Sequence, residues 1–428
     1  MWSSTPTDVE RAHVSFDLVV VGVGYVGLPL AAAATAAGMT VAGYDTDPDV
    51  VRTLAEGRSH VLDVSRTELH AMRTRGFTPT TDPAVIAGAD TVVICVPTGL
   101  GPDGRPDLGA VRAAAETVSD HLRAGTLVIL ESTSFPGTTD EVVRPILERH
   151  GLVAGEDFPL GYSPERIDPG NRTFGVRNTP KVVSGHTPLC AKHCATFYCR
   201  FVDSVVVARG TREAEMAKLL ENTYRYVNIA LVNEIAVFCD QLGVDVWDVL
   251  HCAATKPFGF QPFTPGPGVG GHCIPVDPRY LLDKARREGA QLGVVEAARR
   301  VDSAMPSYVV ERAVRLLTRA GVSVDGARIL LLGVSYKADV PDTRESAAFR
   351  IADELRALGA DVTYHDPVAG EVPALGPPVA DLRSALRTSD ATVLLVAHSG
   401  YDLGHLARNA RLLLDVTGSV PGGEVMRL

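Results

Sequence analysis

The most reactive side chain in a shaped stretch of this sequence is the thiol of Cys273, which ends a loop rich in proline and glycine. Residues 265–273 read PGPGVGGHC, and Asp277 follows four residues after the cysteine. Proline fixes φ and glycine permits positive φ, so the loop has one required path. Without side chains in the way, its backbone N–H groups can approach an anion closely. The pattern predicts a thiol nucleophile beside a bound ligand. The alternative is a plain connector with an incidental cysteine.

Two further polar residues, Lys218 and Asn222, are four positions apart in a stretch with helical periodicity. Apolar residues recur at helical spacing through residues 212–242, which predicts one long helix. Lys218 and Asn222 then share a face of that helix. A cation and an amide N–H can stabilise an oxyanion. The spacing alone, however, favours an ordinary solvated stripe.

A strand, a glycine-rich turn and an alanine-rich helix lie near the N-terminus. Residues 17–23 are an apolar strand that runs into GVGYVG at 22–27, and a second strand, 40–44, ends in Asp45. In this order the motif predicts a dinucleotide site, with the pyrophosphate at the helix N-terminus and Asp45 on the adenosine ribose. Because a carboxylate there repels a 2′-phosphate, we expect NAD to be preferred over NADP. The turn residues expected to bind it are Gly22, Gly24, Tyr25, Val26 and Gly27.

Further strands bring polar residues to the same edge of the predicted sheet. Strands at 90–96 and 126–131 are each followed by small polar residues or proline. In doubly wound sheets the ligand lies beyond the carboxyl ends of the strands. The residues expected there, near the nicotinamide or the substrate, are Pro97, Thr98, Ser132 and Thr133. Later strands are predicted at 159–165, 181–185 and 202–208.

The composition narrows the possible partners. The chain has 428 residues, 46% of them hydrophobic and 21% charged, which is typical of a globular protein of two or three domains. A net charge of −10 argues against binding to nucleic acid. The first residues lack an apolar signal core, and no uninterrupted apolar run is long enough to span a membrane. We therefore expect a cytoplasmic protein that does not associate with membranes.

Seven cysteines are scattered along the chain, an odd number that indicates no disulfide framework. A zinc site deserves consideration only where three cysteines and two histidines cluster: His186, Cys190, His193, Cys194 and Cys199. The cluster has no CxxC pair, and residues 191–198 are typical of a helix with its cysteines on the core side. We therefore expect no metal site.

The second half of the chain returns to an α/β pattern. A helix is predicted at 293–319, broken or bent at Pro306, and a strand at 327–333 leads into LGVSYK. This echoes the first turn without a complete GxGxxG, so the second sheet is not expected to bind a dinucleotide in the same way. A helix at 346–358 and strands at 361–365, 391–397 and 412–415 follow.

The expected fold is α/β, with two Rossmann-like doubly wound domains joined by a long central helix. Residues 1–208 form the N-terminal NAD-binding Rossmann domain. Residues 209–306 form a central helical domain with the long spine helix and the cysteine loop. Residues 307–428 form the C-terminal Rossmann-like domain.

With these elements placed, the sequence resembles the UDP-glucose/GDP-mannose dehydrogenase family over nearly its whole length. Within that family it is most similar to the UDP-N-acetylglucosamine and UDP-N-acetylmannosamine 6-dehydrogenases. Six motifs in the family's order carry the resemblance: GVGYVGLPLA (22–31), STSFPGTT (132–139), YSPER (162–166), KLLENTYRYVNIALVNE (218–234), PGPGVGGHCIPVDP (265–278) and SYKADVPDTRES (335–346).

The resemblance implies a role for several residues. Cys273 is the catalytic thiol, Lys218 and Asn222 are pocket groups, and Thr133, Glu165 and Asp277 handle protons and water. Arg344 is expected on the cofactor side and Lys337 on the nucleotide-sugar side, in the C-terminal domain. The full expected substrate-binding set is Glu165, Arg166, Lys218, Asn222, Phe263, Pro265, Gly266, Gly268, Gly270, Gly271 and Lys337. The family also implies a homodimer built through the central helix.

The implied reaction is an NAD-dependent, four-electron oxidation of the C6 hydroxymethyl of a nucleotide sugar to the uronic acid. It proceeds through a thiohemiacetal and a thioester on Cys273. UDP-N-acetylglucosamine is the substrate expected first, and UDP-N-acetylmannosamine, UDP-glucose or another nucleotide hexose is the alternative. Two departures from the family leave the sugar open: Thr264 replaces an aromatic residue, and no basic residue follows Asp415.

Two other classes of function fit parts of the pattern. A two-electron β-hydroxyacid-type dehydrogenase also sets a lysine and an asparagine at this spacing after a Rossmann domain, but it needs no thiol. A non-catalytic protein that binds NAD or a nucleotide sugar would need none of the reactive residues. Cys273 therefore distinguishes the first alternative, and the full reactive set argues against the second.

Overall fold

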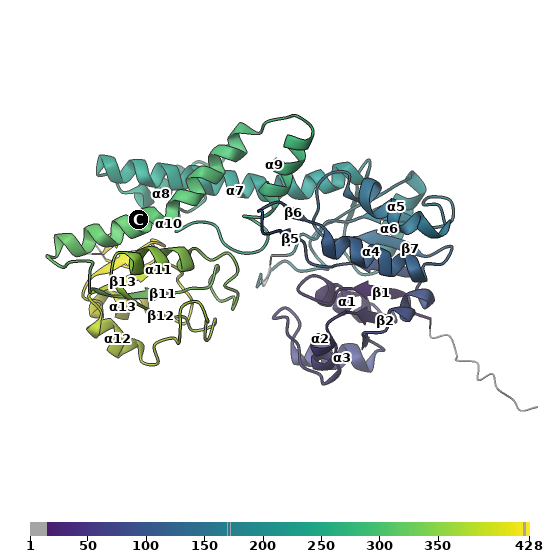
Figure 1. Cartoon of the computed structure of the whole chain (residues 1–428), viewed down its shortest axis with the longest axis horizontal. Coiled ribbons are helices and arrows are strands. Elements are labelled where there is room, and N and C mark those ends of the chain that lie inside the picture. Colours follow the sequence, from purple (N-terminus) through teal and green to yellow (C-terminus); the bar gives the residue numbers. More distant parts are fainter. Residues whose placement is uncertain (1–14, 169, 172, 423–424) are drawn as a thin grey trace, which may run out of the picture. The chain divides into compact units, whose positions relative to one another are not determined.

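The computed structural model describes residues 15–168, 170–171, 173–422 and 425–428 (Figure 1). The chain divides into two compact units, residues 1–218 and 219–428. The division falls inside the longest helix, α7 (Thr211–Leu242).

The first unit is built on an eight-stranded sheet with the order β10-β9-β8-β7-β4-β1-β2-β3. Neighbouring strands run parallel except β8 and β9, which are antiparallel. The strands β1, β2, β4 and β7 are buried along their whole length, as expected where helices cover both faces. The strands are β1 (Leu18–Val21), β2 (Val41–Tyr44), β3 (Thr78–Thr80), β4 (Thr91–Ile94), β7 (Leu127–Leu130), β8 (Leu160–Tyr162), β9 (Lys181–Gly185) and β10 (Val205–Val207).

Helices connect these strands and build the core of the unit. One face of the sheet packs against α1, α3 and α6, through residues such as Leu28, Leu69 and Phe197. The helices are α1 (Gly27–Ala36), α2 (Pro48–Ala55), α3 (Arg66–Thr74), α4 (Gly109–His121), α5 (Arg144–Leu147) and α6 (Pro188–Tyr198). Shorter pieces are a hairpin of β5 (Gly99–Leu100) and β6 (Pro106–Asp107), a π-helical turn (Thr139–Val143) and 3₁₀ turns at Pro83–Gly88 and Glu148–His150.

The second unit begins with helices. After α7 come α8 (Val246–Ala254), α9 (Asp277–Arg287) and α10 (Gly293–Arg319). Of the break or bend predicted at Pro306, the break is wrong, because α10 is a single helix that contains this proline, and the bend stays a prediction. Pro306 is buried in the middle of the helix, so its packing outweighs the lost backbone hydrogen bond.

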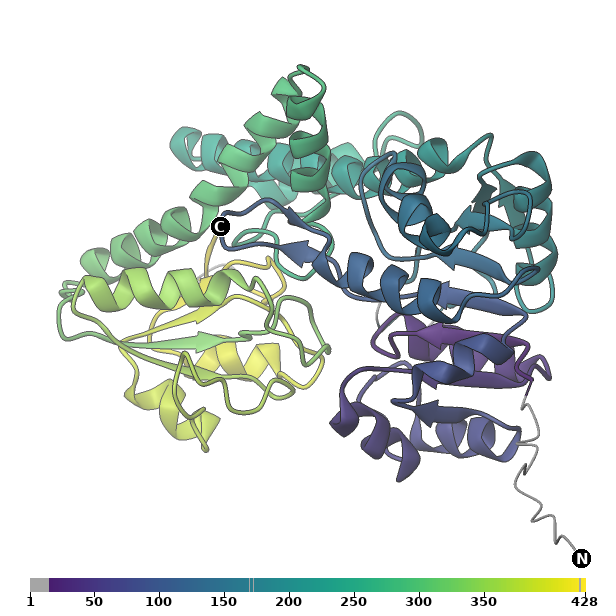
Figure 2. The ribbon, with the colours of Figure 1, turned by 45° about the vertical axis from the view of Figure 1, so that its right-hand side comes forward.

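A five-stranded parallel sheet, with the order β12-β11-β13-β14-β15, completes the second unit. Successive residues of β11 point to opposite faces, Ile329 and Leu331 toward α10 and α11, and Leu330 and Leu332 toward α12 and α13. Figure 2 shows helices on both faces of this sheet. The elements are β11 (Arg328–Leu332), α11 (Ala347–Ala357), β12 (Asp361–His365), α12 (Leu382–Thr388), β13 (Ala391–Leu394), α13 (Leu403–Asn409), β14 (Leu413–Asp415) and β15 (Met426–Arg427).

The predicted fold class is confirmed: two Rossmann-like parallel sheets and one long helix between them in the sequence. The predicted strands are present, although several are shorter at their ends, and the long helix begins one residue earlier than predicted, at Thr211. Among the residues that the structure describes, no helix is both long and apolar enough to cross a membrane.

Candidate active site

The glycine-rich turn after β1 has the backbone that a dinucleotide needs. Gly22 has a φ of +89°, and a Cβ there would lie 3.0 Å from the carbonyl oxygen of Cys95. A Cβ on Gly27 would lie 1.9 Å from the carbonyl oxygen of Gly22, so only glycine fits either position. A Cβ on Gly24, in contrast, would meet no described atom within 4 Å, which leaves that side of the turn open to a ligand.

Two further observations fit a bound NAD. The residue that caps α1, Val26, has no polar side chain, so no capping side chain competes with an anion at this helix N-terminus, although the Leu28 amide donates to the Gly24 carbonyl at 3.1 Å. Asp45 follows β2, and its carboxylate accepts hydrogen bonds from the amides of Val23 (3.0 Å) and Asp47 (3.0 Å). These bonds hold the carboxylate beside the turn, at the position that meets the ribose in this motif. The side chain of Tyr25 is exposed.

The carboxyl ends of β4 and β7 carry the other predicted cofactor residues. Thr98 and Ser132 are buried, and the Ser132 hydroxyl donates to the carbonyl of Val96 at 2.7 Å. This bond ties the two strand ends together. Pro97 is exposed and Thr133 is half-buried, so both reach the surface of this edge.

A buried cluster of charges lies at the same edge of the sheet. The Lys181 ammonium contacts Oε1 of Glu131 and lies 3.1 Å from Oε2 of Glu165. Glu131 follows β7, Glu165 follows β8, and Lys181 begins β9. Because β9 is antiparallel to β8, its first residue lies beside the carboxyl ends of β7 and β8. Glu165 was predicted as a site residue from the sequence, whereas Glu131 and Lys181 were not.

The environment shifts the ionisation of this cluster. Burial raises the pKa of the Glu165 carboxyl, while hydrogen bonds from the amides of Ile167 and Arg166 and the charge of Lys218 oppose that rise. Burial lowers the pKa of the Lys181 ammonium below its usual value. The spacing of Lys218 and Asn222 alone favoured a solvent-exposed helix face, but the structure buries Lys218.

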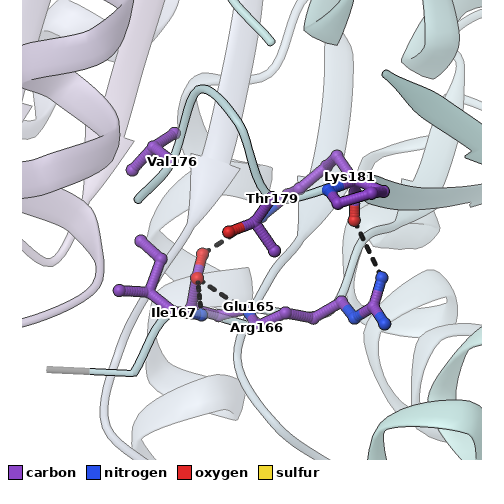
Figure 3. A pocket seen from close by; sticks show the side chains of 7 residues that line it. Glu165, Arg166, Ile167, Val176, Thr179 and Lys181 are labelled. Atoms are coloured by element: carbon purple, nitrogen blue, oxygen red, sulfur yellow. Dashed lines mark hydrogen bonds and ion pairs between the residues drawn. The ribbon is translucent and has the colours of Figure 1, made fainter. Parts of the chain in front are cut away.

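Figure 3 shows a small cavity beside Glu165. Its lining residues are Glu165, Arg166, Ile167, Val176, Thr179, Pro180 and Lys181. The Arg166 side chain stretches along one edge of it, and its guanidinium donates to the carbonyl of Pro180 at 2.8 Å. The carboxylate of Glu165 is therefore fixed by neighbours on several sides.

The remaining predicted catalytic residues meet in the second unit. The Asn222 amide donates to the Asp277 carboxylate at 2.5 Å, and the Asp277 amide donates to the Cys273 carbonyl at 2.9 Å. Asp277 is buried at the start of α9, whereas Cys273 is exposed and forms no disulfide. The fold thus brings Cys273, Asn222 and Asp277 together, and places Thr133, Glu165 and Lys218 in the first unit.

Three hydrogen bonds hold the loop that leads to the cysteine. The side chain of Asn233 accepts from the Gly266 amide at 2.9 Å, and Asp302 accepts from the Val269 amide at 2.8 Å. The Gly271 amide donates to the carbonyl of Arg344 at 2.9 Å. Asn233 and Asp302, which hold this loop, were not among the site residues predicted from the sequence. Their only sequence signal was polarity on otherwise apolar helix faces.

The loop glycines are required by close packing. A Cβ on Gly270 would lie 2.7 Å from Cβ of Tyr336, and one on Gly271 would lie 2.9 Å from the Tyr336 ring. Gly268 and Gly271 have φ values of +125° and +89°, which side chains rarely adopt. The predicted single path of this loop follows from these contacts. Pro265 within it is buried.

The other predicted binding residues lie around this loop or in the second sheet. Phe263 packs edge-on against Tyr224, with ring centroids 6.0 Å apart. Thr264 is exposed, and Lys337 is half-buried in the turn after β11. Arg344 forms a two-pronged ion pair with Asp342, at 3.0 Å and 2.6 Å.

The second sheet also has an aspartate, Asp366, at the position that corresponds to Asp45 in the first sheet. Asp366 follows β12, and its carboxylate accepts from the amides of Val334 and Ser335 and from the ring of His398. These bonds lower the pKa of Asp366, and the carboxyl is buried. The expectation that this sheet binds no dinucleotide in the same way stays a prediction. Asp415, also buried, accepts from Thr417 and Val420.

The cysteine–histidine cluster forms no metal site among the residues that the structure describes. Cys190 and Cys194 are buried on the core side of α6, as predicted, whereas Cys199 follows the helix and is exposed. The ring of His186 pairs instead with Asp140, at 2.6 Å.

Known proteins resemble this chain along most of its length. Three domain models of the UDP-glucose/GDP-mannose dehydrogenase family match it: the NAD binding domain at residues 16–202, the central domain at 212–304 and the UDP binding domain at 330–420. The UDP-N-acetyl-D-glucosamine 6-dehydrogenase of Pseudomonas aeruginosa is 39% identical over 352 residues, 82% of each chain.

Two further comparisons agree. The NDP-N-acetyl-D-galactosaminuronic acid dehydrogenase of Ralstonia nicotianae is 35% identical over 415 residues, 93% of this chain and 95% of that one. The solved structure of the UDP-D-ManNAc dehydrogenase from Pyrococcus horikoshii superposes with a TM-score of 0.87 and 31% identity, covering 96% of this chain and 98% of that one.

The fold, the NAD-type turn and these matches define an NAD-dependent dehydrogenase. More particularly, the chain belongs to the UDP-glucose/GDP-mannose dehydrogenase family, as its motifs indicated. The predictions of the family and of NAD as the cofactor are confirmed.

Proposed function

We propose that this enzyme oxidises the C6 hydroxymethyl of a UDP-linked N-acetylhexosamine, UDP-N-acetylglucosamine first, to the uronic acid. The observation that carries the proposal is the group formed by the exposed Cys273 thiol, Asn222 and the buried Asp277. The relatives named for N-acetylated UDP sugars support the class of substrate. We assign residues 1–208 to NAD, 209–306 to the cysteine loop and spine helix, and 307–428 to the nucleotide sugar.

When bound, NAD⁺ accepts a hydride from C6 in each of two oxidations. The residues that would hold it are those of the turn at 22–27 together with Asp45, Pro97, Thr98, Ser132 and Thr133, with Arg344 as a further contact. The first oxidation also requires removal of the alcohol proton. Asp277 and Thr133 are the groups assigned to this proton transfer, directly or through water.

Cys273 makes the second oxidation possible. An aldehyde carbon becomes a hydride donor only when it is tetrahedral. The thiolate sulfur bonds to C6, the carbonyl electron pair moves to oxygen, and a thiohemiacetal forms. Loss of hydride from the oxyanion of this thiohemiacetal then gives a thioester. The Asn222 amide N–H and the Lys218 ammonium are assigned to the negatively charged oxygen at each tetrahedral stage.

Water completes the cycle by attack on the thioester carbon. Its proton goes to the carboxylate of Glu165, the C–S bond breaks, and the sulfur leaves as thiolate. The products are the sugar acid and free Cys273. Oxidation of one alcohol to an acid removes four electrons, so two NADH form for each sugar.

This stoichiometry is the test of the proposal. UDP-N-acetylglucosamine, UDP-N-acetylmannosamine, UDP-N-acetylgalactosamine, UDP-glucose and GDP-mannose are supplied separately, and NADH absorbance is compared with sugar acid measured by mass spectrometry. We expect two NADH per acid, with the highest kcat/KM for UDP-N-acetylglucosamine. One NADH with a free aldehyde or ketone would overturn the four-electron reaction and favour the two-electron alternative. Preference for another UDP sugar would correct the substrate alone.

We also propose a homodimer formed through α7. Large apolar side chains are exposed along one face of this helix, at spacings of three, four and seven residues. An isolated surface stripe of this kind is typical of an interface. The exposed side chains are Leu220, Tyr224, Leu231, Ile235, Phe238 and Leu242.

A further inference from the structure

The charge cluster in the first unit contains a lysine that the proposed reaction does not use. Lys181 is almost fully buried, with 6% of its side chain exposed, and it lies between the carboxylates of Glu131 and Glu165. Glu131 is completely buried. Burying three ionisable groups costs several kcal/mol per ion unless their mutual attraction offsets it, so such a cluster is weak evidence for stability. A functional reason is the better explanation.

The contacts of Lys181 point to Glu165. The Lys181 side chain crosses from the start of β9 to the residues that follow β7 and β8. The Lys181 ammonium contacts the carboxylate of Glu131, and it lies 3.1 Å from Oε2 of Glu165. Oε1 of Glu165 already accepts from the amides of Arg166 (2.7 Å) and Ile167 (2.6 Å). One carboxylate is therefore oriented through both of its oxygens.

We propose that Lys181 is a positioning residue, which holds the Glu165 carboxylate ionised and oriented to take a proton from the attacking water, with Glu131 as its anchor. The inference rests on the proposed function, because it assigns this role in hydrolysis of the Cys273 thioester. No oxidant or further reactant is needed: the water proton moves to Glu165, and the thiolate leaves.

The surroundings of the pair favour this assignment. Burial raises the pKa of Glu165, so the carboxyl needs a nearby cation to remain a base near neutral pH. The other charged or titratable groups that act on the pair are Lys218, Arg166, Cys95 and Tyr198. Cys95 is directed at Glu131, with its sulfur 3.6 Å from Oε2, and the Lys181 nitrogen lies 5.2 Å from the Tyr198 ring centre. Among these contacts, the ion pair at 3.1 Å joins Lys181 directly to Glu165.

The test uses the full enzyme and four variants: Lys181→Met, Lys181→Arg, Glu131→Gln and the control Lys192→Met, which removes an exposed lysine from α6. Rapid-quench single turnovers at a series of pH values give the rate of sugar-acid release. Intact-protein mass spectrometry measures the acyl-enzyme on Cys273. Thermal unfolding and NAD⁺ binding show which variants are folded.

We expect Lys181→Met to raise the pKa of Glu165. The acidic side of the curve of hydrolysis rate against pH, called the acid limb here, then moves to higher pH by about one unit. This slows hydrolysis about tenfold on that limb, and acyl-enzyme accumulates. Lys181→Arg, which keeps the cation, restores the wild-type limb. Glu131→Gln weakens the hold on the Lys181 ammonium, so the acid limb moves to higher pH, by less than in Lys181→Met. Lys192→Met follows the wild type.

Folded Lys181→Met with the wild-type pH profile would overturn the inference and leave the proposed function intact. The inference would also be overturned if Lys181→Arg were folded but hydrolysed the thioester with the pH dependence of Lys181→Met, because packing and not charge would then matter. If Lys181→Met does not fold, an unchanged pH–rate profile in Glu131→Gln would overturn the inference and leave the proposed function intact. A wild-type enzyme that yields one NADH and no acyl-enzyme would overturn both proposals.

Discussion

Exposure and neighbours separate one cysteine from the other six. Burial raises the pKa of the Cys95 thiol, and that of Cys194 to about 12, so neither supplies thiolate at neutral pH. Cys199, Cys252 and Cys273 are exposed. Of these three, Cys273 is the one whose backbone is bonded to Asp277, which in turn accepts from Asn222. The assignment of Cys273 as the proposed nucleophile thus depends on its surroundings and not on its residue type alone.

At this scale we predict that Cys273→Ser abolishes formation of the sugar acid and leaves the fold and NAD⁺ binding intact. A free thiol is already a few per cent thiolate at neutral pH, whereas a serine hydroxyl needs a dedicated base. Steady-state acid production should fall by about 10³-fold or more, as expected for loss of a nucleophile. Acid is measured by mass spectrometry and NAD⁺ binding by fluorescence.

Cys199→Ser and Cys252→Ser are the matched controls, because both remove an exposed thiol. Both should retain wild-type turnover. Near-normal acid production by Cys273→Ser would rule out the covalent route, whereas slow accumulation of a sugar ester on Ser at this position would support it.

At the scale of elements, α7 orders loops that lie far from it in the sequence. Near its start, Glu215 accepts from the amides of Gly137 (2.5 Å) and Thr139 (2.8 Å) in the loop after β7. Near its middle, Asn233 accepts from Gly266 in the cysteine loop. The helix therefore supplies buried acceptors to the loops and does more than connect two sheets.

Glu215 makes the stability of this arrangement depend on pH. Burial raises the pKa of Glu215 from 4.5 to about 7, although its hydrogen bonds oppose the rise. Between these values the unfolded chain has released the proton and the folded chain still holds it. The folded state binds more protons, so the free energy of unfolding contributed by Glu215 falls as pH rises from about 4.5 to about 7.

We predict that Glu215→Gln removes this dependence and destabilises the protein by about 1–3 kcal/mol at acidic pH, where an amide N–H₂ now faces a backbone donor. Urea unfolding of wild type and variant at several pH values gives the comparison. The difference between the two proteins should shrink as pH rises through the window. A difference that grows with pH would show that Glu215 is stabilised as the ionised form, contrary to this prediction.

At the scale of the whole molecule, one face of α7 carries large apolar side chains that remain exposed in a single chain. Leu231 and Phe238 are each 53% exposed, although the residue that follows each of them, Val232 and Cys239, is buried. The helix is therefore apolar on two faces, and one of them faces solvent in a single chain. Burial of that face against a second copy would remove it from water.

We predict that Leu231→Lys combined with Phe238→Lys produces a monomer with an unchanged fold. Each substitution places a charge where the proposed dimer buries an apolar side chain, and burying an unpaired charge is costly. Light scattering after size exclusion gives the mass, and circular dichroism checks the fold. Leu358→Lys, at an exposed leucine outside α7, is the matched control and should leave the mass unchanged. A wild-type protein that is itself monomeric at micromolar concentration would refute the dimer.

Local chemistry made part of this protein readable from its sequence. The turn at Gly22 and Gly27, the acid at Asp45 and the long helix rest on backbone sterics and on apolar periodicity, which act over a few residues. Those features of the fold agree with prediction to within a residue or a few. Where the local signal was ambiguous, as at Pro306, tertiary packing decided, and the helix continued.

Tertiary structure alone decided which polar residues meet. Glu131, Glu165 and Lys181 lie apart in the sequence and come together because β9 turns antiparallel beside β8, which no local pattern specifies. In the sequence, Lys181 is the charged first residue of the strand predicted at 181–185, and a lysine at the end of a strand is ordinarily exposed to solvent. Long-range strand order buried it between two carboxylates, and burial is what gives a common residue type its unusual ionisation.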